Sequence, residues 1–201
     1  AAVTNVREPG RNRADARSRG ELTTRFLQSR QPVEHFLDQL QPQGDAYNGF
    51  SLLCGRINPD TAHQLYHFSN RASAPHPLQP GLHGISNHLL DTPWPKLTSG
   101  RSALAAVLHQ EDFLLDDLLP VLDHRLPAAD ADLPDTGVGL PMERILSARF
   151  IQAPEIGYGT RASTVLRVDR DGRVEWKEWS WDADGSLTRA VRHGFTLEVQ
   201  A

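Results

Sequence analysis

The sequence predicts an α+β fold in which antiparallel sheets are flanked by helices. Apolar residues recur with helical spacing between residues 18 and 40 and again between 101 and 124, whereas residues 163–199 alternate as strands do. Runs of helices and runs of strands that follow one another in this way are typical of α+β proteins. With 201 residues, 39% of them hydrophobic, and a mean hydropathy of −0.45, the chain can close the core of a single soluble domain.

The beginning of the chain predicts one strand and two helices. The short apolar run Ala1–Val6 ends at a Pro-Gly turn and is predicted as a strand. Ser18 and Glu21 have the spacing of a capping box, which favours a helix that continues to about Arg30. Pro32 suits the first position of a second helix, whose apolar residues keep the 3.6-residue period.

The period changes to that of strands in the middle of the chain. Strands are predicted over Phe50–Cys54 and Gln64–Phe68, around a turn at Asn58–Asp60, and a third strand over Leu82–Asn87. After residue 100 the sequence predicts a second helix pair within 101–124 and then a Pro- and Asp-rich loop over 125–142. The rest is predicted as strands and turns: a strand over Ser163–Val168, a turn at Asp169–Gly172, a strand over Arg173–Trp181, a turn at Asp182–Gly185 and a last strand that ends at Val199.

The composition excludes several classes of protein. A net charge of −4 does not favour a partner such as nucleic acid or an anionic membrane surface. No stretch approaches the ~20 apolar residues of a membrane-spanning helix. A single cysteine, Cys54, excludes an intramolecular disulfide and a multi-cysteine metal site, and its apolar surroundings predict a buried packing role. The lone cysteine and the lack of a visible export signal favour a cytoplasmic location.

Two motifs of other enzyme classes are present only in part. Asp135 begins an Asp-Thr-Gly triplet, but an aspartic protease needs two such carboxylates that share a proton, and the chain has one triplet. His63 and His67 have the spacing of a helical metal pair, but in a strand that spacing separates them by about 13 Å. We therefore expect no metal site.

Several polar residues lie where a ligand or a reaction intermediate could be held. Asn5 and Asn87 each end a predicted strand, where an amide can donate to an oxyanion; the alternative is that each is an ordinary turn residue. Trp94 lies between two prolines, as a flat platform for a ligand or as part of a loop that covers the core. Lys96 and Arg161 can bind a carboxylate or phosphate, or Arg161 can pair with Glu175 or Glu178 across the hairpin.

These residues belong to a series of segments that resembles a known family. In chain order the segments are T-N-x-R, S-R-G-E-L, Y-x-G-F-x-L, S-N-R, G-x-S-N-x-L-L-D-T-P-W-P-K and Y-G-T-R-x-S-T, and together they resemble the NRDE family. Members of that family begin with Met-Cys and carry an Asn-Arg-Asp-Glu box, neither of which is present in this sequence. The resemblance therefore implies a single but incomplete domain over residues 1–201, without its first part.

The resemblance implies a four-layer αββα sandwich of the N-terminal-nucleophile hydrolase type, lacking the first strands. In such hydrolases an N-terminal cysteine attacks an amide, and its α-amino group serves as the base. By that similarity Asn5 and Asn87 would stabilise the oxyanion, and Arg161, or in competition with it Arg149, would be the active-site arginine.

The resemblance also implies two kinds of function. The first is the handling of haem or another amphipathic, anionic, lipid-like ligand, for which the motifs supply five binding residues, namely Arg19, Asp91, Trp94, Lys96 and Tyr158. The alternative is an N-terminal-cysteine amidohydrolase that acts on small acyl amides, with its nucleophile outside this chain. A scaffold without a small-molecule site is a third, weaker interpretation. No cofactor other than haem as a ligand is expected.

Overall fold

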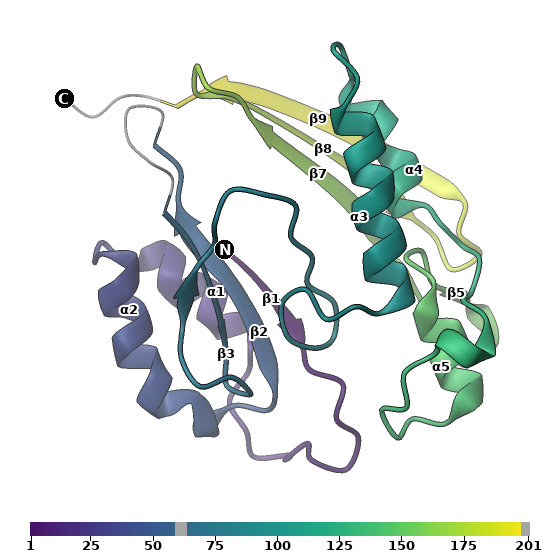
Figure 1. Cartoon of the computed structure of the whole chain (residues 1–201), viewed down its shortest axis with the longest axis horizontal. Coiled ribbons are helices and arrows are strands. Elements are labelled where there is room, and N and C mark those ends of the chain that lie inside the picture. Colours follow the sequence, from purple (N-terminus) through teal and green to yellow (C-terminus); the bar gives the residue numbers. More distant parts are fainter. Residues whose placement is uncertain (59–63, 198–201) are drawn as a thin grey trace. The chain divides into compact units, whose positions relative to one another are not determined.

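The chain divides into two compact units, each with a hydrophobic core of its own. A computed structural model describes residues 1–58 and 64–197; the first unit comprises residues 1–92 and the second begins at Pro93 (Figure 1). The two units are described separately below. The predicted antiparallel sheets and flanking helices are present in both, so the α+β prediction is confirmed.

The first unit contains an antiparallel four-stranded sheet in the order β1-β2-β3-β4. Its strands are β1 (Ala2–Asn5), β2 (Phe50–Arg56), β3 (Gln64–Ser69) and the short β4 (His76–Pro77). Three of these were predicted within two residues. Pro59 and Asp60, part of the predicted turn between β2 and β3, lie outside the described residues, as does His63.

Two helices, α1 (Gly20–Gln28) and α2 (Val33–Leu40), cover one face of this sheet. Every second residue of β2 points to them, because side chains alternate between the two faces of a strand. The core of the unit comprises Leu22, Phe26, Val33, Phe36, Leu37, Leu40, Tyr47, Phe50, Leu52, Cys54 and Phe68. A 3₁₀ helix (Gln41–Ala46) leads from α2 toward β2. Cys54 is buried as predicted.

Two local predictions in this unit were wrong. Ser18 does not cap α1: the helix begins after Arg19, and Glu21 instead pairs with Arg17 at 2.5 Å and accepts a hydrogen bond from Tyr47. The Glu21 carboxylate binds the Arg17 guanidinium and the Tyr47 hydroxyl, and these partners stabilise it more than a backbone amide at an exposed helix end would. Residues 82–87 form a loop and not a strand, because side chains rather than a β-ladder hold their backbone groups, as described below.

The helix pair predicted within residues 101–124 is present, and its first helix begins earlier, at Pro95. The helical region consists of α3 (Pro95–Leu108), a 3₁₀ helix (Leu115–Leu118) and α4 (Leu119–Leu122). Pro95 and Pro120 both lie in the first turn of a helix, where the missing N–H of proline does no harm, and Pro120 could not lie inside a longer helix. A further 3₁₀ helix (Asp130–Asp132) lies within the loop predicted over 125–142, and α5 (Leu140–Ser147) begins before the predicted end of that loop.

The second unit ends in an antiparallel three-stranded sheet, β7 (Ala162–Val168), β8 (Arg173–Trp181) and β9 (Leu187–Thr196), in that order. Both predicted turns are present, with Gly172 and Gly185 at φ angles of +74° and +78°, where glycine is favoured. β9 ends at Thr196, and the predicted end at Val199 lies outside the described residues. A two-stranded hairpin of β5 (Gln152–Ala153) and β6 (Tyr158–Gly159), which was not predicted, precedes the sheet.

The core of the second unit lies between α3, α4 and one face of this sheet. Its buried residues are Leu115, Leu118, Phe150, Val165, Trp179 and Trp181. None of the helices over the described ranges has both the length and the apolar character that a membrane crossing requires. Within the same residues, no three His, Cys, Asp or Glu side chains are grouped so that they could hold a metal ion.

Candidate functional site

The residues predicted to form one site are divided between the two units. Asn5, Arg19, Asn87 and Asp91 belong to the first unit, whereas Trp94, Lys96, Tyr158 and Arg161 belong to the second, together with Arg149. A cavity in each unit is lined by residues from or beside these motifs, and the two are described in turn.

Asn5 and Asn87 lie side by side although 82 positions separate them in the sequence. The Asn87 amide nitrogen Nδ2 donates to the Asn5 carbonyl oxygen at 3.4 Å, and the Arg7 backbone N–H donates to the Asn87 carbonyl at 2.7 Å. The loop that contains Asn87 therefore runs along the end of β1. The contact joins the Asn87 side chain to the backbone of Asn5, at the end of β1.

A cavity of about 240 Å³ lies next to this contact, on the face of the sheet that the helices do not cover. Its lining residues are Ala2, Thr4, Ser51, Leu53, Leu78, His83, Gly84, Ile85 and Leu90. Two hydroxyls tie the loop to the sheet: Thr4 donates to the Ser86 carbonyl at 2.8 Å, and Ser51 donates to the His88 carbonyl at 2.9 Å. Asn5 is the neighbour of Thr4 and pairs with the core residue Phe50, so by strand alternation its side chain points to the opposite face.

Asp91 holds the loop over this cavity in shape. Its Oδ1 accepts the Gly84 N–H at 2.8 Å, its Oδ2 lies 2.8 Å from His83 Nδ1, and its own φ of +55° is in the left-handed region. The carboxylate predicted to bind a ligand thus has partners within its own loop.

Beside Ser51 lies a buried histidine that the sequence did not single out as part of a site. His67 is 1% exposed, and its Nε2 lies 3.3 Å from Ser51 Oγ. Burial, together with the neighbouring His76, lowers the pKa of His67 to about 4, so the imidazole is neutral at physiological pH. The sequence did contain a signal for this position. Tyr66 and Phe68 of β3 face the core, so strand alternation predicts that His67 between them faces the other side of the sheet.

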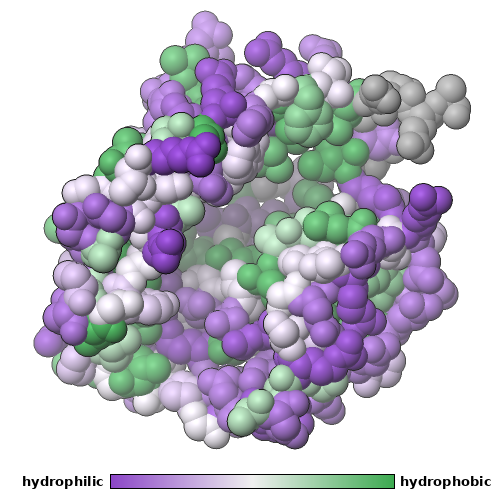
Figure 2. All heavy atoms as spheres, turned by 180° about the vertical axis from the view of Figure 1, so that it is seen from behind, coloured by the Kyte–Doolittle hydropathy of each residue, from purple (hydrophilic) through white to green (hydrophobic). Residues whose placement is uncertain are grey.

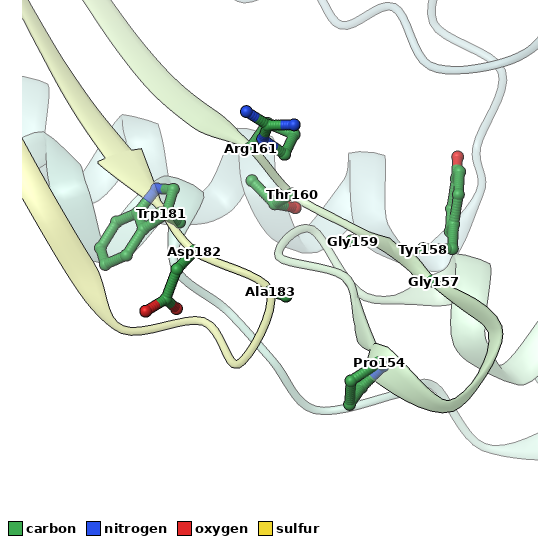
Figure 3. Close-up of a pocket in the computed structure, with 9 residues that line it drawn as sticks. All are labelled: Pro154, Gly157, Tyr158, Gly159, Thr160, Arg161, Trp181, Asp182 and Ala183. Atoms are coloured by element: carbon green, nitrogen blue, oxygen red, sulfur yellow. The ribbon is translucent and has the colours of Figure 1, made fainter.

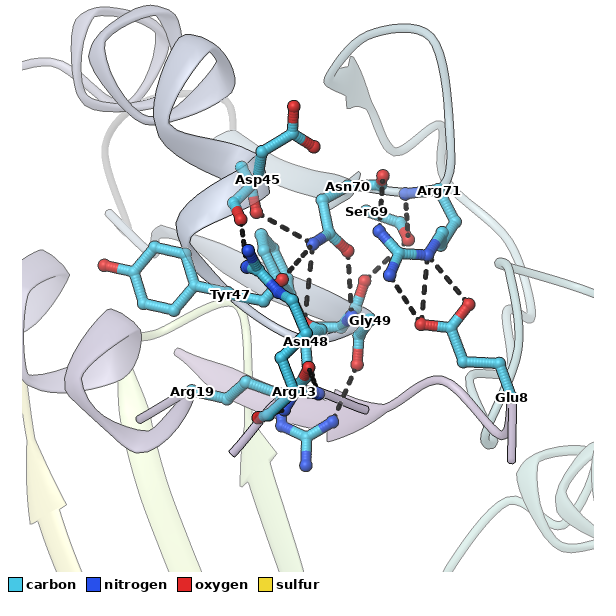
Figure 4. A network of polar contacts seen from close by, with 12 residues as sticks. Glu8, Arg13, Arg19, Asp45, Tyr47, Asn48, Gly49, Ser69, Asn70 and Arg71 are labelled. Carbon is cyan, nitrogen blue, oxygen red and sulfur yellow. Dashed lines mark hydrogen bonds and ion pairs between the residues drawn. The ribbon is translucent and has the colours of Figure 1, made fainter. Parts of the chain in front are cut away.

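Figure 4 shows that three of the motif segments bind one another in the first unit. Arg19 donates to the Gly49 carbonyl at 2.9 Å, and Arg71 makes a two-pronged ion pair with Glu8, with N···O distances of 2.8 Å and 2.5 Å. The side chain of Asn70 donates to the Gly44 carbonyl at 2.9 Å and accepts the Phe50 N–H at 2.9 Å. Arg19 therefore has a structural partner in addition to its predicted role as a ligand cation.

The second candidate site is an open cavity of about 580 Å³ around the loop between β6 and β7 (Figure 3). Its lining residues are Pro154, Gly157, Tyr158, Gly159, Thr160, Arg161, Trp181, Asp182 and Ala183. The structure thus brings the predicted residues Tyr158 and Arg161 to one cavity.

Hydrogen bonds hold this loop in place without using the Arg161 side chain. Thr160 donates its N–H to the Ile151 carbonyl at 2.8 Å and accepts the Ile151 N–H on its hydroxyl at 2.9 Å. The Arg161 carbonyl accepts the Trp181 N–H at 2.9 Å. Within residues 1–58 and 64–197 no hydrogen bond or ion pair engages the Arg161 guanidinium, so its charge is available to a ligand.

The alternative that Arg161 pairs across the hairpin is wrong. The strand register places Glu178 opposite Thr164 and Glu175 opposite Arg167, because Arg161 precedes the first residue of β7. The carboxylate of Glu175 accepts hydrogen bonds from Arg192 and Arg167, and that from Arg192 above all holds its pKa below the usual range.

The aromatic wall of this cavity is Trp181, which was predicted only as the end of a strand. Its ring is 7% exposed, packs edge-on against Phe150 with centroids 5.0 Å apart, and donates Nε1–H to Ser163 Oγ at 3.1 Å. In the view of Figure 3 the side chains of Arg161 and Tyr158 project to one side of the loop and the Asp182 carboxylate to the other. The cavity therefore combines the Arg161 cation with the packed Trp181 and the half-exposed ring of Tyr158.

Both cavities lie within the part of the chain that matches a family model. Residues 1–183 match the model described as Transport and Golgi organisation 2. The chain belongs to the Transport and Golgi organisation 2 family. It is 35% identical to the "Transport and Golgi organization protein 2 homolog" of Bos taurus and 34% identical to that of Homo sapiens, and each comparison covers 98% of this chain and 74% of the relative. The predicted NRDE-family membership is confirmed.

Three other predicted residues of this Transport and Golgi organisation 2 family member do not line the larger cavity. Trp94 precedes the first residue of α3, and its ring centroid lies 5.9 Å from the Lys96 ammonium. Arg149 donates to the Val121 carbonyl at 2.6 Å and to Ser99 Oγ at 2.5 Å, and burial lowers its pKa. Of the two competing arginines, Arg161 lines the cavity and Arg149 joins α3 to α4.

Proposed function

We propose that this chain binds an anionic, amphipathic ligand in the cavity beside the Tyr158–Arg161 loop. The observation that carries the proposal is the Arg161 guanidinium, which lines the cavity without a bonding partner in the described part of the chain. An arginine can hold a carboxylate or phosphate through two parallel hydrogen bonds. The half-exposed ring of Tyr158 offers apolar surface for the rest of the ligand, and the buried Trp181 closes one side of the cavity.

The cavity also restricts where the charge of the ligand can lie. Asp182 lines it as well, and its Oδ1 accepts the Ser186 N–H at 2.9 Å, so this carboxylate is fixed by its turn. An anion is therefore attracted at Arg161 and repelled near Asp182. A ligand with one anionic end and a long apolar body meets both conditions.

Haem fits this description as a bound substrate rather than as a metal-ligated cofactor. The volume of about 580 Å³ falls within the roughly 300–1,000 Å³ of ordinary ligand pockets. Its nine described lining residues include no His, Cys or Met, so a haem here would be held through its carboxylates at Arg161 and through its apolar faces. A fatty-acid anion fits the same chemistry, and we use both as probes.

Titration of the chain with haemin, followed by its Soret absorbance, and with dodecanoate, followed by calorimetry, tests the proposal. We expect saturable binding, and at least tenfold weaker binding by the Arg161→Ala variant, because a charge-assisted hydrogen-bond pair contributes roughly 1.5–3 kcal/mol. Arg170→Ala is the matched control, since Arg170 is exposed in the turn between β7 and β8. Equal binding by both variants would refute the site, and no binding of either probe would favour a scaffold.

A second candidate function rests on the contact between Asn5 and Asn87. We propose as the alternative that these amides stabilise the oxyanion of an amidohydrolase whose nucleophile lies outside this sequence. Cys54 is unsuited as that nucleophile, because burial raises its pKa to about 11 and keeps the thiol protonated. In a family member that carries the N-terminal cysteine, replacing the counterpart of Asn87 by Ala should lower acyl-amide hydrolysis by ~10²–10³. An unchanged rate would count against the alternative.

We further propose the four-layer αββα architecture that the family resemblance implies. Each sheet has helices packed on one face, which is the arrangement of half of such a sandwich. The relatives are named for transport and Golgi organisation, and we propose that ligand binding by this chain serves a process of that kind from the cytoplasm. Imaging of a fluorescent fusion beside a Golgi marker tests the location.

A further inference from the structure

His67 carries a buried ring nitrogen that has no partner in the described part of the chain. Hydrophilic residues cover much of the face drawn in Figure 2, as is usual for polar side chains, whereas His67 of β3 is 1% exposed. No described residue forms a hydrogen bond with its Nδ1. Buried polar groups almost always have a partner, so this nitrogen calls for an explanation.

The hydrogen bonds of Ser51 determine which nitrogen of His67 carries the proton. Ser51 donates its one hydroxyl hydrogen to the His88 carbonyl at 2.9 Å, so toward His67 the Ser51 oxygen can only accept. Nε2 of His67, 3.3 Å from that oxygen, is therefore the protonated nitrogen. Nδ1 is left with a lone pair that no described donor engages, and such a lone pair on a neutral imidazole is a metal ligand.

A second histidine lies directly opposite His67 on the neighbouring strand. Sequence spacing had suggested only His63 as a partner, whereas the ladder pairs His67 with His76 of β4, on the same face of the sheet. The two ring centroids are 5.1 Å apart, and the planes are inclined by 61°, so the rings do not stack face to face. Two imidazoles on one tetrahedral zinc ion, with Zn–N bonds of about 2.0–2.1 Å, have ring centres roughly 5 Å apart. The spacing of the pair therefore suits a shared ion.

The charge around this pair also suits a cation. Burial above all, and the neighbouring His76, lower the pKa of His67 to about 4, whereas the Asp91 carboxylate acts on it in the opposite direction. A negative charge therefore acts on the ring of His67. Because the ring is neutral near pH 7, protons do not compete with a metal ion for its Nδ1.

We propose that His67 Nδ1 and the ring of His76 together bind Zn²⁺ or a similar divalent transition-metal ion. Imidazole nitrogen is a preferred ligand of such ions. Water fills the remaining positions at the exposed His76, because no third His, Cys, Asp or Glu is grouped with the pair among the residues that the structure describes. Ser51 orients the His67 ring by accepting its Nε2–H, as the outer partners of metal-bound histidines do. The site lies in the first unit and does not depend on the ligand cavity beside Arg161.

Calorimetric titration of the full chain with Zn²⁺, after treatment with a chelator and dialysis, tests the proposal. We expect one ion per chain, and at least tenfold weaker binding by His67→Gln and by His76→Gln, since loss of even an outer partner of a metal-bound histidine typically costs roughly 10–100-fold in affinity. His35→Gln, which removes an exposed histidine of α2, is the matched control and should bind as the unaltered chain does. Absence of binding by the unaltered chain, or equal binding by His76→Gln, would overturn the proposal.

Thermal unfolding gives a second measurement on the same variants. Zn²⁺ should raise the unfolding midpoint of the unaltered chain and of His35→Gln but not that of His76→Gln, because an ion that binds only the folded state stabilises it. Mg²⁺, which prefers oxygen ligands, should leave all midpoints unchanged. His76 is exposed, so its replacement decides the test even where circular dichroism shows that His67→Gln does not fold. An equal zinc-induced shift in His76→Gln would place the ion elsewhere and refute the site.

Discussion

The burial of His67 in the first unit makes the stability of the fold depend on pH. His67 is buried on the sheet face opposite the helices, and its Nδ1 has no hydrogen-bond partner in the described part of the chain. A neutral imidazole tolerates this environment, whereas an imidazolium would lose most of its hydration there. The folded state therefore binds the proton of His67 less strongly than the unfolded chain does.

Acid should destabilise the chain through His67. Its pKa lies near 6.5 in the unfolded chain and about 4 in the folded one, so the stabilisation is complete above pH 6.5 and is lost as the pH falls toward 4. Between pH 7 and pH 5 the unaltered chain should lose about 2 kcal/mol of unfolding free energy through His67, and His67→Gln should not show this loss. Urea unfolding at both pH values measures this, with His35→Gln on the exposed side of α2 as the control. If the unfolding free energy of His67→Gln depended on pH as that of the unaltered chain does, the lowered pKa of His67 would be contradicted.

Gly49 is a second residue whose role is set by its neighbours. A Cβ atom at this position would lie 2.9 Å from the Val6 Cβ and would overlap the Glu8 carboxylate that binds Arg71. We expect Gly49→Ala to lower the free energy of unfolding by about 1–3 kcal/mol, as overpacking does in a tight site. Gly20→Ala, at the start of α1, is the control, because a Cβ atom there would contact only Ser18 Oγ, at 3.6 Å. Thermal unfolding of both variants measures this effect, and equal midpoints would show that a Cβ atom at position 49 does not clash with Val6 and Glu8.

At the scale of elements, one side chain holds the segment that leads into β2. Asn70 follows β3 directly, and its amide donates to the Gly44 and Tyr47 carbonyls at 2.9 Å and 3.3 Å while it accepts the Phe50 N–H. The Gly44 carbonyl also accepts the Tyr47 N–H, at 3.1 Å, whereas Phe50 lies just beyond the last register pair of β2 and β3, so the Asn70 amide takes the place of a strand partner for its N–H.

Replacing this amide should destabilise the first unit. We expect Asn70→Ala to lower the unfolding free energy by about 1–3 kcal/mol, because it leaves buried backbone groups unpaired. Gln28→Ala, at the exposed end of α1, should change it by less than about 0.5 kcal/mol. Urea denaturation followed by circular dichroism measures both, and a neutral Asn70→Ala would show that water replaces the amide.

Elements with a strong local pattern were predicted well, and elements that depend on distant partners were not. The hairpin of β7 and β8, with its Asp-Gly turn, and the two helices α1 and α2 were located from turn chemistry and periodicity. The loop over 82–87 was predicted as a strand because its apolar content does not reveal that Thr4 and Ser51 hold its carbonyls. The position of the break within the second helix pair was not predicted, because Leu residues continue with helical spacing through Pro120.

At the scale of the whole molecule, the two cores can be followed by separate natural probes. All four tryptophans lie after Pro93, in the second unit, and the single cysteine, Cys54, is buried in the core of the first. Tryptophan fluorescence therefore reports the second unit, and the reaction of Cys54 with a thiol reagent reports the first.

These probes test the prediction that the chain is one domain. A single αββα sandwich would unfold as one cooperative body, so we expect Asn70→Ala, in the first unit, to lower the tryptophan-fluorescence midpoint and the Cys54-protection midpoint by equal amounts. Two separate transitions, with only the Cys54 midpoint shifted, would show that the units are independent domains and would contradict the single-domain prediction.

The sequence by itself determined the class of fold, most of its strands, its turns and the family, because side-chain alternation, turn residues and motif order are local properties. It also indicated Tyr158 and Arg161, which the structure brings to one cavity. Only the tertiary structure decided which polar residues have protein partners: Arg19 and Asp91 do, whereas Arg161 has none in the described residues. That difference depends on groups brought close by folding from distant parts of the chain, and no local pattern records which charge will find a partner.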